Sequence, residues 1–304
     1  MNNFNIETTQ TLPEQLTLPL SPEVSMEFRL IPPGRFRMGS RDGHSSEQPV
    51  HWVEITRSYY MGIFPVTQEQ FAVWTEFEGI EHENRFPGNP LHPAENVDWN
   101  KACYFCEWLM CRQQSKIPEG YVSGLPSEAQ WEHACRAGVV KEYYSGDGTV
   151  ALSAVGWFGE NSGDKTHPVG GKVANDFGLY DMHGNIYEWC SDTWDEFSYR
   201  KRVDGVRDPI VKSSELGRSE VSAIRVIRGG SWVDSAEWCR AAFRFVRGPG
   251  DSDEFQGFRV CLYLGPCPDE PDSTGAESEP EPGDAVEVNL SESHFPSRSD
   301  GTQF

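Results

Sequence analysis

The chain has 304 residues, of which 47 are acidic and 26 basic, so its formal net charge is −21. A chain of this length can bury a substantial core without support from a metal or disulfides. The negative charge argues against nucleic acid and anionic membranes as partners, because both would repel the chain. We interpret the charge mainly as a source of solubility.

The N-terminal segment, MNNFNIETTQTLPEQLTLPL, lacks two features of a signal peptide. It has no basic start and no unbroken apolar core of about 7 to 15 residues. No apolar run in the chain reaches the roughly 18 residues of a membrane-spanning helix. We therefore expect a cytoplasmic protein. Residues 1–25 are polar with scattered prolines and are predicted to form a flexible lead.

Two strand regions are predicted after this lead. The first is MEFRLIPPGRFRMGS, which begins at Met26, alternates like a strand and is interrupted by a Pro-Pro-Gly turn. The second is VHWVEITRSYYMGIFPV, which begins at Val50 and is rich in β-branched and aromatic residues.

Three short helices are predicted next. The first covers Thr67–Phe77 with Thr67 as its N-cap, and the second covers Trp99–Gln113 with apolar residues at helical spacing. The third follows Ser127, which forms a capping box with Gln130, and ends near Gly138. Loops separate these helices, so the sequence predicts an irregular α+β fold and not a layered sandwich of sheets.

The C-terminal segment, residues 265–304, is rich in Pro, Glu, Asp, Ser and Gly. From residue 266 onward it holds ten acidic residues and one arginine. Such a composition buries too little apolar surface to offset the entropy of ordering, so we expect a disordered acidic tail. Residues 26–264 contain no obvious linker and are predicted to form a single domain.

The eight cysteines are too few and too spread for the disulfide framework of a small secreted domain. Cys103 and Cys106 form a CxxC pair inside a predicted helix, without a second pair at zinc-ribbon spacing. We interpret this pair as buried small apolar side chains, with a metal or redox role as the alternative. The histidines show no HExxH spacing, and there is no phosphate-binding glycine loop or GxSxG motif.

Eight motifs between Phe28 and Cys261 together resemble one family. In chain order they are FRLIPPGRFRMGS, EQPVHWVEITRSYYMGIFPVTQEQF, VDWNKACYFCEWL, GLPSEAQWEHACRAG, HPVGG, GLYDMHGNIYEWCSDTW, RVIRGGSW and GFRV. This series is similar to that of the sulfatase-modifying-factor family, whose founding member is the formylglycine-generating enzyme. The resemblance implies a single compact α+β domain of the C-type-lectin-like kind, with little regular secondary structure and with bound calcium.

The resemblance also implies a chemistry. In the founding enzyme, copper held by two cysteines activates oxygen, which oxidises a sulfatase cysteine in a CxPxR segment to formylglycine. Many relatives keep the fold without this reaction, so the function has to be inferred from the residues of the site.

The segment GLYDMHGNIYEW resembles the family's calcium loop. The resemblance implies side-chain ligands from Asp181 and Glu188 and carbonyl ligands from Gly184 and Ile186. Calcium takes six to eight oxygen ligands, which suits this set. The alternative is that the two carboxylates cap turns and pair with arginines.

A second calcium loop is implied at Asn161, with a carbonyl ligand from Ser162. The following segment, SGDKTHPVGG, is shorter than in the founding enzyme, and its downstream acidic ligand has no counterpart.

The two copper-binding positions of the founding enzyme are five residues apart and fall on Asp234 and Cys239. Copper(I) prefers soft thiolates, which a hard carboxylate does not replace. We therefore expect no copper site and no oxidation by the known route. Arg240 and Arg244 lie near Cys239 in sequence, without a histidine, so we interpret Cys239 as a framework thiol. A catalytic role for Cys239 is the alternative.

Other pocket positions are partly retained. Ser231 matches the serine of the glycine turn, Arg247 matches an arginine of the pocket wall, and Tyr187 replaces a tryptophan. These residues predict a pocket for a protein segment, a peptide or a small ligand. We expect a divergent binding or accessory domain. The alternative is a formylglycine-generating oxidase acting on a CxPxR cysteine of a sulfatase, or another oxidase using the same pocket.

Overall fold

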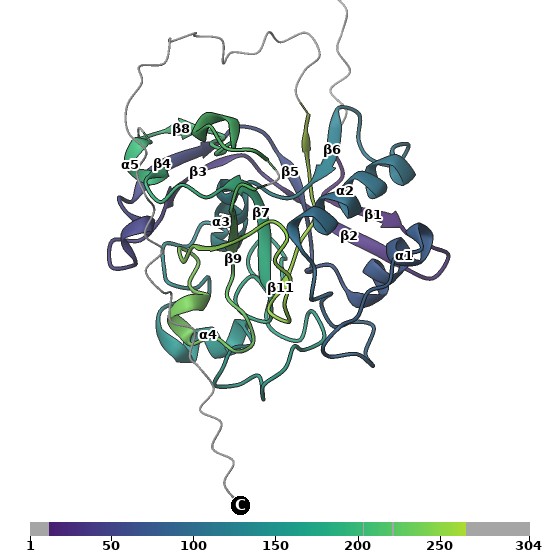
Figure 1. Cartoon of the computed structure of the whole chain (residues 1–304). Coiled ribbons are helices and arrows are strands. Elements are labelled where there is room, and N and C mark those ends of the chain that lie inside the picture. The colour runs from purple at the N-terminus through teal and green to yellow at the C-terminus, as the bar shows by residue number, and fades with distance from the viewer. Residues whose placement is uncertain (1–11, 203, 221, 266–304) are drawn as a thin grey trace, which may run out of the picture. The chain divides into compact units, whose positions relative to one another are not determined.

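Three small sheets form the β part of the fold within residues 12–202, 204–220 and 222–265, which the computed structural model describes (Figure 1). The largest has the strand order β1 (Gln15–Pro19), β2 (Ser25–Ile31), β5 (Tyr59–Gly62), β12 (Cys261–Leu264) and β6 (Tyr121–Gly124). The second has the order β10 (Phe245–Arg247), β9 (Arg225–Arg228), β7 (Tyr187–Thr193) and β11 (Gln256–Gly257). The third has the order β3 (Gly34–Met38), β4 (His51–Ile55) and β8 (Val206–Arg207).

Neighbouring strands run antiparallel in these sheets, except that β11 is parallel to β7 and β8 is parallel to β4. In the largest sheet, Cys261 of β12 lies opposite Met61 of β5 and Gly124 of β6. The last described strand is therefore held between two others, which joins the C-terminal part of the domain to its N-terminal part.

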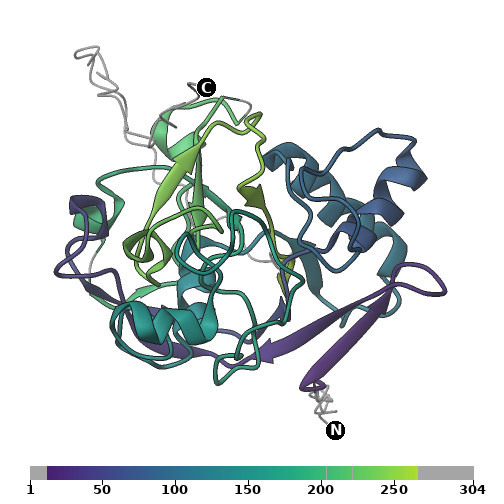
Figure 2. The ribbon, with the colours of Figure 1, turned by 90° about the horizontal axis from the view of Figure 1, so that it is seen from below.

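The helices are short and separated by loops. They are α1 (Gln68–Glu78), α2 (Trp99–Gln113), α3 (Glu128–Arg136), α4 (Gly148–Val155) and α5 (Ser198–Lys201), with 3-10 turns η1 (Ser45–Glu47), η2 (Ser214–Leu216) and η3 (Ala236–Cys239). In Figures 1 and 2, α1 and α2 lie together on one side of the ribbon and α4 lies on the other. The predicted α+β domain with little regular secondary structure is confirmed.

The predicted helices agree closely with those of the structure. The Thr67 side chain accepts a hydrogen bond from the Gln70 N–H, as expected for the N-cap of α1, and α2 has the predicted bounds. Ser127 and Gln130 form the predicted capping box of α3. A capping box satisfies donors that a helix start otherwise leaves unpaired, so these short helices are defined locally.

The strand predictions need one correction. Residues 15–19, which we assigned to a flexible lead over 1–25, form β1 and pair antiparallel with β2. Leu18 is fully buried in the core, so this part of the chain gains enough apolar contact to be ordered. The predicted acidic tail lies outside the described residues from residue 266 onward.

Two large clusters of buried side chains form the core. One lies around α1 and α2 and contains a group of contacting aromatic rings: Phe71, Trp74, Phe105, Trp108 and Phe258. The other joins α3, through Trp131, to the sheet of β3 and β4, through Met38 and Val53. Within the described ranges, no helix is long and apolar enough to cross a membrane.

Candidate functional site

The RGGSW segment forms a tight turn at the end of β9. Gly229 and Gly230 have φ angles of 100° and 72°, in the left-handed region that favours glycine. A Cβ atom on Gly230 would lie 2.6 Å from the Sγ atom of Cys239 and 2.9 Å from its Cα atom. The turn therefore packs directly on Cys239, and only glycine fits at position 230.

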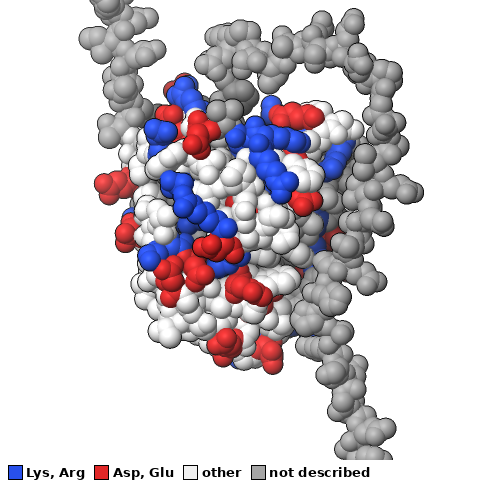
Figure 3. All heavy atoms as spheres, turned by 90° about the vertical axis from the view of Figure 1, so that its left-hand side faces the viewer, with Lys and Arg blue, Asp and Glu red and all other residues white. Residues whose placement is uncertain are grey.

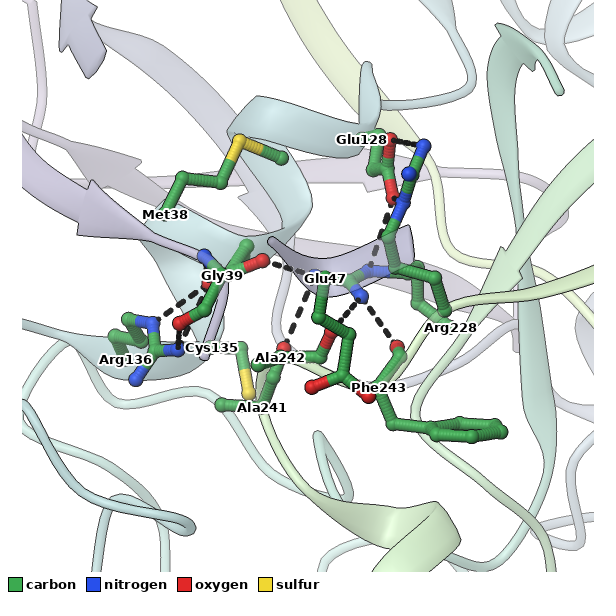
Figure 4. Close-up of polar contacts among 12 residues, drawn as sticks. Met38, Gly39, Glu47, Glu128, Cys135, Arg136, Arg228, Ala241, Ala242 and Phe243 are labelled. Atoms are coloured by element: carbon green, nitrogen blue, oxygen red, sulfur yellow. Dashed lines mark hydrogen bonds and ion pairs between the residues drawn. The ribbon is translucent and has the colours of Figure 1, made fainter. Parts of the chain in front are cut away.

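Arg228, the first residue of this segment, is fully buried. Its guanidinium donates to the carbonyl oxygens of Ala241 (3.0 Å) and Ala242 (2.8 Å) and to that of Phe243 (Figure 4). It also forms an ion pair with Glu132 of α3. Arg228 thus connects the turn, the segment that follows Cys239 and helix α3.

Asp234 is the residue that the resemblance places at the first of the two copper-binding positions of the founding enzyme. Its Oδ2 atom accepts hydrogen bonds from the Ser231 N–H (2.8 Å) and from the Ser231 hydroxyl (2.6 Å). Burial raises the pKa of Asp234, although these hydrogen bonds oppose the rise. Asp234 therefore stabilises the loop that follows the glycine turn, and Ser231 is its partner.

Cys239 lies at the second position and is fully buried in η3. It packs in a small apolar cluster with Tyr143, Leu152, Val155 and Phe158. Burial raises the pKa of its thiol well above the ordinary value, and the negative charge of Asp234 adds to the rise. A buried thiol of this kind is a poor nucleophile, because the thiolate is the reactive form.

The two arginines that follow Cys239 in sequence do not activate its thiol. Arg240 forms a bidentate ion pair with Glu47, with distances of 2.9 and 3.0 Å. Arg244 forms one with Glu128, with distances of 2.5 and 2.8 Å. Their charges are therefore compensated by buried carboxylates.

Half-buried aromatic side chains lie beside this loop. The Trp238 ring contacts Phe243 and Phe245, with ring centroids 5.2 and 5.7 Å apart. Phe245 in turn stacks on the buried Tyr187, whose pKa is raised by burial and then by the charge of Asp234. Arg247 also contacts Phe245 and pairs with Asp253 at 3.3 Å. The structure thus brings Tyr187 and Arg247 together at an aromatic surface near Asp234.

The predicted calcium loop contains a buried carboxylate with one unsatisfied atom. Asp181 Oδ2 accepts a hydrogen bond from the Gly170 N–H at 2.7 Å. Asp181 Oδ1 is buried and has no hydrogen-bond partner within the described ranges. Burial raises the pKa of Asp181 to about 6. Gly184 is required for space, because a Cβ atom there would lie 2.0 Å from the Trp157 carbonyl oxygen.

Glu188, the other acidic residue of this loop, is engaged by protein groups. Its Oε1 atom lies 2.8 Å from Arg259 Nη2, and its Oε2 atom accepts from the Trp131 indole at 2.7 Å. Glu188 thus forms the arginine pair that the alternative interpretation predicts. Among the residues that the structure describes, no group of three or more His, Cys, Asp or Glu side chains is placed to hold a metal ion.

The second predicted calcium set is occupied by local hydrogen bonds. The Asn161 Oδ1 atom accepts from the Phe158 N–H at 2.9 Å, and its Nδ2 atom donates to the Gly156 carbonyl at 3.0 Å. The Ser162 carbonyl accepts from His167 Nε2 at 2.6 Å. The oxygen atoms that would bind calcium here are already hydrogen-bond acceptors.

Comparison with known families assigns the fold. Residues 18–263 match the sulfatase-modifying factor enzyme 1-like domain of the FGE-sulfatase family. The chain belongs to this family. The match includes β1 from residue 18, which agrees with the burial of Leu18.

Several curated proteins are similar to this chain in sequence. The chain is 31% identical over 254 residues to the serine/threonine-protein kinase pkn1 of Chlamydia caviae, covering 77% of this chain and 37% of that protein. It is 25% identical over 303 residues to the formylglycine-generating enzyme of Thermomonospora curvata, covering 78% of this chain and 93% of that protein. The chain thus spans less than two-fifths of the length of the pkn1 relative.

Solved structures share the FGE-like fold. Treponema denticola variable protein 1 superposes with a TM-score of 0.68 and 26% identity, covering 82% of this chain and 99% of that chain. PvdO from Pseudomonas aeruginosa superposes with a TM-score of 0.67 and 25% identity, covering 84% of this chain and 100% of that chain.

Sequence reasoning did not single out the aromatic residues that lie near Asp234 in this FGE-sulfatase domain. Trp238, Phe243 and Phe245 were not among the candidate residues, although aromatic residues are dense after the GGSW turn. The cysteine pair of α2 shows no sign of a reactive thiol among the described residues. Burial raises the pKa of Cys103 to about 12 and that of Cys106 well above its ordinary value, and both are free thiols.

Proposed function

We propose that this chain is a binding or accessory domain of the FGE-sulfatase family that does not carry out copper-dependent cysteine oxidation. The main support for this proposal is the state of the two side chains at positions 234 and 239. Asp234 is a carboxylate held by Ser231, and Cys239 is a fully buried thiol. Copper(I) selects thiolates, and this pair offers one thiol whose ionisation is strongly opposed by burial.

The ligand we propose is a peptide or protein segment bound at the aromatic surface of Trp238, Phe243 and Phe245. Aromatic side chains supply large contact areas and are enriched at binding hot spots. Arg247 contacts Phe245 at the edge of this surface, where its charge is paired with Asp253.

Copper binding and peptide oxidation test the loss of the family reaction. The purified chain is loaded with copper(I) and incubated with a CxPxR peptide in the presence of oxygen and a thiol reductant. We expect weak copper binding and no aldehyde product by mass spectrometry. Aldehyde formation that depends on the added copper would refute the proposal and favour the formylglycine-generating oxidase.

Peptide binding tests the proposed ligand surface. A library of immobilised peptides is screened with the wild type, with Trp238→Ala and with Trp52→Ala. Trp52 is a matched control, because it is a partly exposed tryptophan on β4 and outside the aromatic cluster. We expect only Trp238→Ala to weaken binding, by about tenfold or more. Equal binding by all three proteins would show that the peptide does not bind at this surface.

We also propose that calcium binds at Asp181, where the unsatisfied Oδ1 atom favours a cation. The carbonyl groups of Gly184 and Ile186 complete the family's ligand set, together with a Glu188 carboxylate that is shared with Arg259. Calcium would supply positive charge that stabilises this buried loop.

Thermal unfolding with calcium and with a chelator tests this site. We expect chelation to lower the melting temperature of the wild type and to leave Asp181→Asn unchanged. Asp164→Asn is the matched control, since Asp164 is an exposed aspartate that also has a positive φ, of 58°. A wild-type melting temperature that changes with neither calcium nor chelator would contradict the proposed site.

A further inference from the structure

A cavity of about 430 Å³ lies between the segment after β3, the end of α3 and the loop before α4. Five basic side chains line it: Arg37, Arg41, Arg136, Lys141 and Arg240. Three acidic side chains also line it: Asp42, Glu142 and Asp147. On the left-hand side of the molecule in Figure 1, which Figure 3 turns toward the viewer, groups of Lys and Arg side chains lie among Asp and Glu side chains.

Arg136 and Arg240 are fixed in place by buried carboxylates. Arg136 donates to Glu132 (2.8 Å) and to two backbone carbonyl oxygens, those of Gly39 and Lys141 (3.1 Å each). Arg240 pairs with Glu47 in a bidentate manner and donates from Nε to the Glu237 carbonyl oxygen (2.8 Å). A guanidinium has five N–H donors, so these bonds leave donors on both arginines for a ligand. Because both side chains are already held in place, binding of that ligand would not cost the entropy of ordering them.

Arg37 and Arg41 have no ion pair within the described residues, although Arg37 lies over the Trp52 ring at 5.5 Å. Asp147 and Glu142, which line the cavity from the loop before α4, accept hydrogen bonds from neighbouring residues of that loop. Asp147 accepts from the Lys141 ammonium (2.6 Å) and the Glu142 N–H (3.0 Å), and Glu142 accepts from the Gly148 N–H (2.8 Å). Like Arg37 and Arg41, the lining residues Asp42 and Glu142 have no ion pair among the described residues. The excess of hydrogen-bond donors in the cavity therefore rests on its five basic and three acidic side chains.

We propose that this cavity binds a small molecule that carries an oxyanion group, such as a phosphate, sulfate or carboxylate. Guanidinium groups donate only and match planar or tetrahedral oxyanions with paired N–H groups. The cavity volume falls in the range of about 300–1,000 Å³ that is usual for small-molecule sites. Trp238, Phe243 and Phe245 are not among the residues that line this cavity, so the proposal does not depend on a role for the aromatic surface.

Calorimetric titration of the full chain with inorganic phosphate, inorganic sulfate and citrate tests the proposal. We expect at least one of them to bind saturably, with a dissociation constant of about 1 mM or tighter. The tightest of the three identifies the oxyanion class. Failure of all three to bind saturably would overturn the proposal.

Two arginine variants test the location. Arg41→Gln removes an exposed side chain of the cavity, and Arg35→Gln removes an exposed arginine of β3 that does not line it. Arg35→Gln controls for the loss of one positive charge, because Arg35 is exposed like Arg41. Arg35 also lies 5.5 Å from the Trp52 ring, as does Arg37 of the cavity lining. We expect Arg41→Gln to weaken binding about tenfold and Arg35→Gln to leave it unchanged. Equal effects of both variants would assign the binding to the general surface charge and overturn the proposed site.

Discussion

Substitution of Arg228 by methionine tests the buried ion network that holds the glycine turn. Methionine keeps most of the apolar stem and removes the guanidinium. Three carbonyl groups, those of residues 241–243, then lose a donor, and Glu132 loses one of its two arginine partners. Glu132 retains Arg136 and the Gly39 N–H, so it is not left without compensation.

The expected cost follows from these contacts. Removal of one partner from a buried ion pair costs about 3–5 kcal/mol, and a buried acceptor that loses its donor costs about 1–3 kcal/mol. Relaxation around the smaller side chain and the remaining Glu132–Arg136 pair reduce the sum. We expect Arg228→Met to lower the free energy of unfolding by about 4 kcal/mol.

Urea unfolding, followed by tryptophan fluorescence and circular dichroism, measures this change. A double-mutant cycle with Glu132→Leu should give a coupling energy of about 1–3 kcal/mol, because the two side chains are in contact. Arg200→Met is the control, since Arg200 is exposed in α5, and it should change stability by less than about 0.5 kcal/mol. A loss below about 1 kcal/mol for Arg228→Met would show that the network does not hold the turn.

Three further substitutions test other parts of the fold. His183 is buried, and burial lowers its pKa from 6.5 to about 3. Its contribution to the free energy of unfolding is therefore fully present above pH 6.5 and is lost as the pH falls below 6.5, because the unfolded chain binds the proton more tightly. Between pH 7 and pH 5 the wild type should lose about 2 kcal/mol more than His183→Gln, as measured by urea unfolding at each pH. Arg240→Met leaves the buried Glu47 without a cation and should cost about 3 kcal/mol in the same assay. Thr67→Ala removes the N-cap of α1 and should lower the unfolding free energy by about 1 kcal/mol, with a threefold smaller loss or none contradicting the capping role.

Local signals allowed the helices to be predicted from the sequence. The Ser127–Gln130 capping box and the apolar spacing of residues 99–113 involve neighbours within one or two turns. Strand pairing depends on distant residues, and it was harder to predict. β2 and β3 flank the Pro-Pro-Gly turn, yet they belong to different sheets and pair with β5 and β4. A turn signal alone does not distinguish a hairpin from a crossing between sheets.

The site shows the same division. Position 234 lies three residues after Ser231 of the GGSW turn, so the resemblance placed Asp234 at the first copper-binding position from the sequence alone. The burial of Cys239 depends on a cluster formed by residues 143–158, which lie far from it along the chain. The pairing of Glu188 with Arg259 joins residues 71 positions apart. Sequence spacing offered both a calcium role and an arginine pair for Glu188, and only the packed structure shows the pair.

The motifs that identify the family are joined to one another in the buried interior. Trp131 of GLPSEAQWEHACRAG donates to Glu188 of GLYDMHGNIYEW, which pairs with Arg259 of GFRV. Glu132, from the first of these motifs, pairs with Arg228 of RVIRGGSW. Each group would be costly to bury without the other, because an unpaired buried charge is strongly destabilising. These motifs therefore maintain the fold whether or not a reaction occurs. A match to the family therefore reports the buried ion pairs that the motifs form, and it does not by itself report the chemistry of positions 234 and 239.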